Sequence, residues 1–273
     1  MCQHNKPNSR LLRAFIPVTA TDDPAKVADI ASIFTPLVDF DLEIVGCATL
    51  SLFDFPVAGP AIGMPIPGFA VKQSIRRVRA EIQDICNEAI SILDKDPSTD
   101  IKPKVGYIDG PLNQIVPSLV SIFDTVIMPH RLKLPMKFRI RRPALDTLIM
   151  KSNKIPVLFY TDTSICWRIV AAQIDSGISF YAEQILSRLA SSLRVKIYQW
   201  FPKQSIDSML PPETGERELS GIPVSCELDN DSVFTDQSGT LLAVPRQIIL
   251  SLFRFHKFRL LLSNWKGNFL ILP

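Results

Sequence analysis

The sequence predicts an α/β protein of two tandem units, each an open, mostly parallel five-stranded sheet with helices on both faces. The first observation is a repeat, in which segment 125–129 leads on to 155–160 and segment 240–245 leads on to 268–272. The first segment of each pair ends in a proline that a basic residue closely follows. The second observation is that the expected strands are continuous apolar runs, which are typical of parallel strands buried on both faces. Their alternation with helical patterns indicates right-handed crossovers that cover the sheet.

Length and composition agree with two folded units. The chain has 273 residues, and domains are usually about 100 to 200 residues long. Hydrophobic residues make up 47% and charged residues 21%, which favours a substantial core over disorder. We place the first unit at 1–163 and the second, shorter unit at 164–273. The second unit is abbreviated because the polar stretches 202–221 and 229–238 do not predict good helices.

The first unit is expected to open with a buried strand over residues 12–19 and a helix. Asp22 and Asp23 supply an N-cap and Pro24 suits the first turn, after which apolar residues recur at spacings of three and four. Further elements are expected in this order: strand 42–50, helix 71–93, strand 104–109, helix 112–122, strand 125–128, helix 144–152 and strand 157–160. Segment 51–70 has four prolines and three glycines among apolar residues, so it predicts either a lid or a loop packed over the sheet edge.

The second unit is expected to repeat this order with some elements missing. Its expected elements are strand 167–174, a helix ending near Leu193, strands 195–201, 224–228 and 240–245, a helix from about Gln247, and strand 268–272. Each strand is again a short run dominated by apolar residues.

Charge and cysteine content exclude several function classes. The formal net charge of +3 does not indicate a nucleic-acid-binding protein. The five cysteines form no pair or group with metal-ligand spacing, so no metal is expected and a reducing, cytoplasmic location is predicted. Residues 1–10 lack the apolar core of a secretory signal, and no apolar run reaches the length of a membrane span. We therefore expect a protein without membrane contacts.

Several segments resemble the universal stress proteins in their tandem form. They are 123–129, 154–159 and 173–176, and the order of elements is similar over about the whole chain. The resemblance implies a fold of the adenine-nucleotide alpha-hydrolase type in each unit. It also implies intrachain pairing of the two units through their last strands.

Nucleotide-binding members of that family have an acidic residue at the end of the first strand and a glycine-rich loop after the fourth. Glycines let backbone N–H groups approach phosphate, and a following helix N-terminus adds positive charge. Here no glycine occurs between Pro129 and Asn153 or between Pro245 and Trp265, and the first strand ends in Thr19 without an adjacent acidic residue. No cofactor is therefore expected, with ATP or another adenine nucleotide as the alternative.

A basic stretch replaces the first glycine loop. Residues 130–142 hold six lysines and arginines and no acidic residue, beyond the carboxyl end of a predicted parallel strand. Arg131, Lys133 and Arg139 are candidate ligands for a small anion, because open α/β sheets bind ligands at this edge. The competing interpretation is a solvated basic face. The stretch has one aromatic residue, which argues against nucleic acid.

The second unit offers Asp175 and Ser176 at the position of the family's acidic residue. They are candidate ligand-binding residues, although either could simply be a helix N-cap. No catalytic residue is predicted, because the chain has no HExxH, GxSxG or P-loop motif.

These observations predict a non-enzymatic, stress-response regulatory or scaffolding protein with degenerate nucleotide sites. Its partners would be other proteins, a second copy in a homodimer, or a small anionic ligand. The alternative is an ATP-binding protein in which the basic side chains hold phosphate, with slow hydrolysis or nucleotide-gated switching. A third hypothesis is the regulatory domain of a membrane transporter.

Overall fold

The computed structural model describes most of the predicted strands and helices. It describes residues 11–37, 40–48, 68–95, 102–110, 112–128, 155–160, 168–172, 179–200, 218–219, 222–227, 239–246 and 267–273, with residues 149, 166, 237 and 265. The chain divides into two compact units, of which the first holds strands β1 to β4 and the second holds strands β5 to β11.

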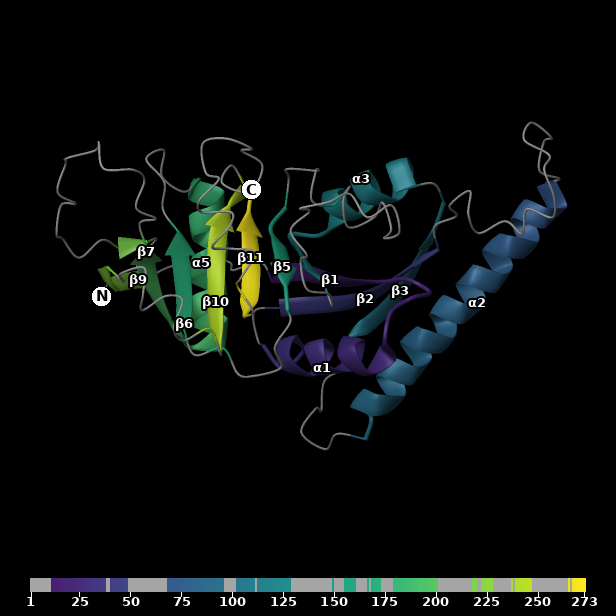
Figure 1. Cartoon of the computed structure of the whole chain (residues 1–273), viewed down its shortest axis with the longest axis horizontal. Helices are drawn as coiled ribbons and strands as arrows, with labels where there is room; N and C mark the ends of the chain where they lie inside the picture. The colour runs from purple at the N-terminus through teal and green to yellow at the C-terminus, as the bar shows by residue number, and fades with distance from the viewer. Residues whose placement is uncertain are drawn as a thin grey trace, which may run out of the picture. The chain divides into compact units, whose positions relative to one another are not determined.

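The first unit has a parallel sheet in the order β3-β2-β1-β4. Its strands are β1 (Leu12–Val18), β2 (Phe40–Ala48), β3 (Lys104–Asp109) and β4 (Thr125–Met128). Its helices are α1 (Pro24–Phe34), α2 (Gly68–Leu93) and α3 (Leu112–Ile122). Figure 1 shows α1 and α2 on one face of these strands and α3 on the other. This is the arrangement that right-handed crossovers produce.

The second unit has a larger, mixed sheet in the order β5-β11-β10-β6-β7-β9-β8. Its elements are β5 (Val157–Phe159), β6 (Arg168–Ala172), α5 (Phe180–Leu193), β7 (Lys196–Trp200), β8 (Glu218–Leu219), β9 (Ile222–Glu227), β10 (Thr240–Pro245) and β11 (Asn268–Leu272). The central strands are parallel, whereas β5 runs antiparallel to β11 and β8 runs antiparallel to β9. The predicted α/β class with mostly parallel strands is confirmed.

Central strands are buried on both faces, as continuous apolar runs predict. In β1, Phe15 and Ile16 point to opposite faces and both are fully buried, and the Phe15 ring lies 4.7 Å from that of Phe123. In the second unit every residue of β6 and β10 is buried. Each unit therefore has its own hydrophobic core around its middle strands.

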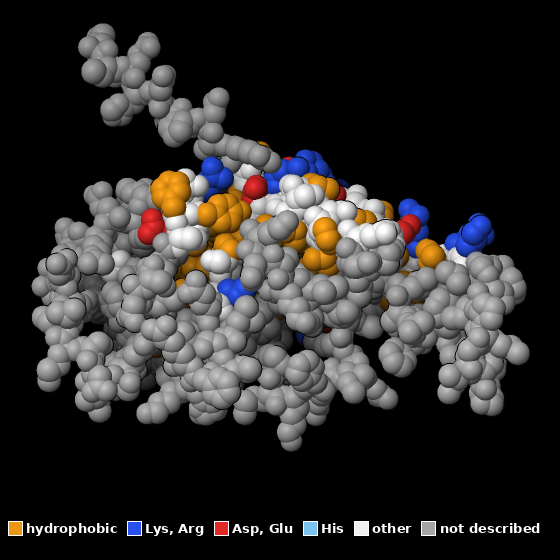
Figure 2. All heavy atoms as spheres, turned by 90° about the horizontal axis from the view of Figure 1, so that it is seen from above, with side chains coloured by type: hydrophobic (Ala, Val, Ile, Leu, Met, Phe, Trp, Pro, Cys, Tyr) orange, Lys and Arg blue, Asp and Glu red, His pale blue; other side chains and the backbone are white. Residues whose placement is uncertain are grey.

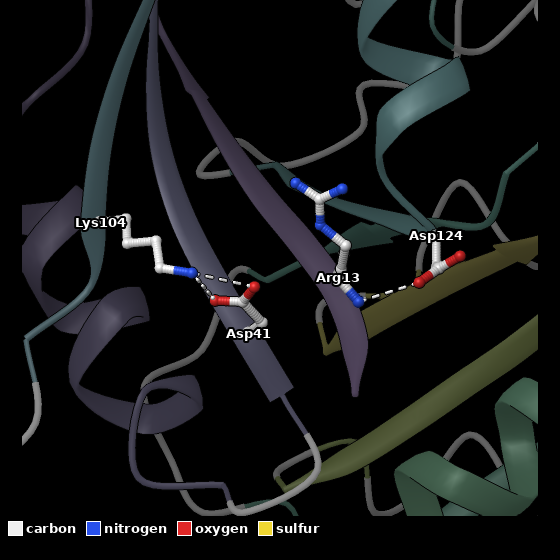
Figure 3. A network of polar contacts seen from close by, with 4 residues as sticks. All are labelled: Arg13, Asp41, Lys104 and Asp124. Carbon is white, nitrogen blue, oxygen red and sulfur yellow. Dashed lines mark hydrogen bonds and ion pairs between the residues drawn. The ribbon is translucent and has the colours of Figure 1, made fainter. Parts of the chain in front are cut away.

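Polar contacts hold the strands of the first unit in place. The Arg13 N–H donates to Asp124 Oδ2 at 3.0 Å, and the Asp124 N–H donates to the Arg13 carbonyl at 2.7 Å. Lys104 Nζ donates to both carboxylate oxygens of Asp41, at 2.8 and 3.1 Å, and so connects β3 with β2 (Figure 3). The Arg13 guanidinium also lies 5.2 Å from the centre of the Phe123 ring.

Some boundaries and one strand differ from the sequence prediction. The long helix begins at Gly68 instead of residue 71, and strand β8 was not predicted at all. The helix predicted from Gln247 and most of segment 51–70 lie outside the described residues. Of the helix predicted at 144–152, the structure describes Ile149, which is helical and fully buried.

The N-cap predicted for the first helix is confirmed, and it yields a stability prediction. Asp23 Oδ1 accepts a hydrogen bond from the Ala25 N–H at 3.0 Å, and Pro24 occupies the first turn. Asp23→Ala should lower the free energy of unfolding by about 1 kcal/mol, because a helix N–H loses its acceptor. Urea unfolding measures the change. Asp23→Asn is the matched control, since asparagine keeps the acceptor; a loss as large as that of Asp23→Ala would rule out capping as the cause.

Candidate functional site

The carboxyl ends of the parallel strands are the places where this architecture can bind a ligand. All five candidate residues predicted there, Arg131, Lys133, Arg139, Asp175 and Ser176, lie outside the described residues. Their roles stay predictions. Neighbouring described residues show how each strand end is built.

In the first unit Asp22, which follows Thr19 by three residues in sequence, folds its side chain back to the end of β1. Asp22 Oδ2 accepts hydrogen bonds from the Thr19 N–H at 2.7 Å and from Thr19 Oγ1 at 2.9 Å. A backbone hydrogen bond from the Asp22 N–H to the Thr19 carbonyl, at 3.1 Å, closes the turn that brings them together. The carboxylate is buried, with 7% of the residue exposed. The spacing of Thr19 and Asp22 was the available signal for such a turn.

A buried thiol lies under the same sheet, between α2 and β3. Cys86 is fully buried, and burial raises the pKa of its thiol to about 11, although a hydrogen bond from the Tyr107 hydroxyl opposes the rise. The pKa of Tyr107 is also raised, chiefly by burial and then by Cys86. Gly46 permits this packing, because a Cβ there would lie 2.7 Å from both Ile82 Cγ2 and Tyr107 Cδ1. Cys86 is therefore held as a neutral thiol, which is a poor nucleophile.

Two buried thiols make the stability of the protein sensitive to alkaline pH. Burial also raises the pKa of Cys166 in the second unit to about 11, from an ordinary value of 9.0. Both groups bind their proton more tightly in the folded state, so their contribution is complete below pH 9 and is lost as the pH rises towards 11. The free energy of unfolding should fall by roughly 2 kcal/mol for each thiol over that range.

Urea unfolding at a series of pH values, under reducing conditions, measures this loss. Cys86→Ala and Cys166→Ala should each flatten the alkaline decline relative to the parent, whatever their effect at neutral pH. An unchanged slope in both variants would mean that other groups cause the decline.

In the second unit a buried arginine occupies the end of β10. Arg246 directly follows this strand, has 3% of its surface exposed and donates from Nη2 to the Ile155 carbonyl at 3.3 Å. Burial lowers the pKa of its guanidinium. This is the basic residue that closes the second copy of the repeat, and it binds main chain close to β5. At the other end of the sheet, Arg168 Nε donates to Thr240 Oγ1 at 2.9 Å.

The helix after β6 is capped by neither candidate residue. Ser179 is the N-cap of α5, and its Oγ accepts a hydrogen bond from the Ala182 N–H at 3.3 Å. The next two residues are aromatic and exposed, with 71% of Phe180 and 40% of Tyr181 accessible. The described start of α5 therefore presents rings to solvent beside the predicted ligand edge.

The order of strands and the polar strand ends can be compared with known proteins. No protein-family model matches the chain, and no curated protein matches it. Among solved structures, a universal stress protein from Archaeoglobus fulgidus has a TM-score of 0.60 at 10% identity, with 97% of each chain covered. The chain has the universal stress protein fold. Two Pseudomonas aeruginosa proteins are also similar, each at 11% identity and with 97% of this chain covered: one of unknown function, with a TM-score of 0.45, and one described as a universal stress protein, with a TM-score of 0.43.

Two further findings for this universal stress protein fold concern metal ions and membranes. Within the described ranges, no group of three or more His, Cys, Asp or Glu side chains is placed to hold a metal ion. The described helices include none with the length and apolar character needed to cross a membrane.

Proposed function

We propose that the protein is a non-enzymatic regulatory or scaffolding protein of the universal stress type, with two tandem copies of the fold and degenerate nucleotide sites. The observation that carries the proposal is the combination of this fold with the absence of glycine from 130–152 and 246–264. Glycines let backbone N–H groups approach phosphate, so their absence from these two segments supports degenerate nucleotide sites.

The sheet order of the two units supports the tandem arrangement. The first unit has the order β3-β2-β1-β4, and the second unit repeats it as β9-β7-β6-β10, with β11 next to β10. The antiparallel ladder of β5 and β11, in which Leu158 is opposite Leu270, supports pairing through the last strand of each repeat.

Arg246 supports degeneration of the second nucleotide site. A guanidinium that is buried against the Ile155 carbonyl lies where the glycine loop would begin. Arginine binds phosphate well when its N–H groups are accessible, but here at least one of them is used by the main chain.

Isothermal titration calorimetry with ATP and Mg²⁺, and mass spectrometry of the purified native protein, test the proposal. We expect no copurified nucleotide, no heat of binding at micromolar concentrations and no phosphate release. Micromolar binding of ATP that Arg131→Ala with Lys133→Ala removes would establish the alternative, an ATP-binding protein with side-chain phosphate ligands. Lys196→Ala is the matched control, because Lys196 is an exposed lysine of the described β7 that neither hypothesis uses.

A further inference from the structure

Among the residues that the structure describes, strand β3 is an open edge of the first sheet. Within the described part of the chain it has one strand neighbour, β2. Its residues are exposed or half-buried throughout, and 39% of Val105 is accessible. An edge strand presents main-chain N–H and C=O groups that can pair with another strand.

The second unit shows how this fold covers such an edge. Strand β9 holds the position in its sheet that β3 holds in the first, and β8 covers β9 in the antiparallel direction. Leu219 is paired with Ile222 in this hairpin. The chain thus closes one of two equivalent edges with an antiparallel strand.

Helix α2, which packs beside β3, has an unusual distribution of charge. Residues 68–80 contain four cations and no acidic residue, whereas residues 81–95 contain four acidic residues and one lysine. A helix is stabilised by acidic residues near its N-terminus and basic residues near its C-terminus, so this order opposes the helix dipole. Among the α2 residues whose burial is described, Lys72, Arg76, Arg77 and Arg79 are exposed, so the basic half presents its charges to solvent.

Three of the four cations form a row on the side of α2 that faces the end of β3. Lys72, Arg76 and Arg79 are four and three residues apart, which places them on one side of the helix. Arg79 Nη1 lies 2.9 Å from Asp109 Oδ2 at the carboxyl end of β3. Arg77 lies off this row and forms an ion pair with Glu81 at 3.7 Å.

Lys72 and Arg76 are exposed, and neither forms an ion pair with a described side chain. Figure 2 shows lysine and arginine side chains at the right-hand end of the view, on the side where Figure 1 draws α2. By helix spacing the two cations lie on the same side of α2 as Arg79, which contacts the carboxyl end of β3, and being exposed they are available to acidic groups.

We propose that the open edge of β3 binds an extended, acidic segment of a partner protein by antiparallel strand addition. Main-chain hydrogen bonds to residues 104–109 would hold the segment, as β8 holds β9, and carboxylates N-terminal to its paired part would contact Arg76 and Lys72. Along the helix these cations lie about 4.5 and 10.5 Å beyond Arg79. With a strand rise of about 3.3 Å per residue, the acidic residues fall roughly one to three positions before the paired stretch.

Selection from a phage-displayed library of random peptides against the purified protein tests this inference. The enriched peptides should carry Asp or Glu just before a run of residues with high β-propensity. As synthetic peptides they should protect the amides of residues 104–109 from hydrogen exchange. Lys72→Ala with Arg76→Ala should weaken binding about tenfold. Arg77→Ala is the matched control and should leave binding within about twofold, because Arg77 lies on the same helix but off the row.

A peptide with the same side chains but N-methylated backbone amides separates strand addition from simple charge attraction. It should lose binding, because its main chain cannot donate to β3. The inference is wrong if the methylated peptide binds equally well, or if no enriched peptide depends on Lys72 and Arg76. It is also wrong if the protein binds only duplex DNA, or only vesicles that contain phosphatidylserine, in a way that depends on Lys72 and Arg76.

This inference rests on the proposed role in protein contacts, but the two can fail separately. If the peptide selection fails and the protein also binds no ATP, only the proposal that the β3 edge binds a partner is wrong. Binding of ATP that depends on Arg131 would overturn the proposed function, whatever the selection shows.

Discussion

Phe15→Ala should lower the free energy of unfolding of the first unit by about 3–5 kcal/mol, the largest effect that we expect from a single substitution. Phe15 is fully buried in the central strand β1, with its ring 4.7 Å from that of Phe123. Truncation of the side chain to alanine removes this contact and leaves a cavity between the sheet and the helices. The cavity cannot close, because the neighbouring strands hold β1 in place on both sides.

The distribution of tryptophan lets this experiment separate the two units. All three tryptophans, Trp167, Trp200 and Trp265, belong to the second unit, so their fluorescence reports on that unit alone. Far-UV circular dichroism reports on both. Phe15→Ala should shift the part of the dichroism transition that belongs to the first unit to lower urea concentration and leave the fluorescence transition unchanged. An equal shift of the fluorescence transition would show that the two units unfold together.

Phe180→Ala is the matched control, because it removes the same side chain from a site that is 71% exposed. It should change the free energy of unfolding by no more than about 0.5 kcal/mol. Equal effects of the two substitutions would contradict the packing of β1 described above.

Gly46→Ala should destabilise the first unit by about 1–3 kcal/mol, although it adds a single methyl group. Its Cβ would lie 2.7 Å from Ile82 Cγ2 and 2.7 Å from Tyr107 Cδ1. Ile82 is almost fully buried and the half-buried Tyr107 lies beside the buried Cys86, so a shift of either side chain disturbs the packing between α2 and β3. Urea unfolding followed by circular dichroism measures the loss.

Gly106→Ala provides the comparison on the neighbouring strand. A Cβ there would meet the end of the Glu43 side chain, which is only half-buried and can swing away. The expected change is within about 0.5 kcal/mol. Strand propensity favours alanine over glycine at both positions, so an equal loss for Gly106→Ala would show that crowding against Ile82 and Tyr107 is not the cause.

Long periodic elements of the fold could be predicted from sequence because their signal is local. Helix α2 and strands β1, β3, β4 and β10 follow directly from apolar spacing. Strand β8 could not be predicted in this way, because two residues carry no period and their extended form depends on pairing with β9.

The strand ends were harder to predict, because their chemistry depends on backbone geometry and on distant partners. The carboxylate of Asp22 reaches the end of β1 only because a turn folds it back onto Thr19. Arg246 is buried against a carbonyl 91 residues earlier in the chain. From sequence, Arg246 does not differ from a solvated arginine, and the spacing of Thr19 and Asp22 indicates a turn but not the burial of the carboxylate.

The antiparallel pairing of β5 with β11 decides how the second unit can be prepared alone. Strand β5 follows the first repeat in sequence but clusters with the second unit. A protein that begins at residue 164 would leave Phe269, Leu270 and Ile271 on a bare, apolar edge strand, which is a template for aggregation. A protein that begins near residue 153 keeps β5 paired with β11, so these three residues stay covered and the second unit retains its β5–β11 ladder.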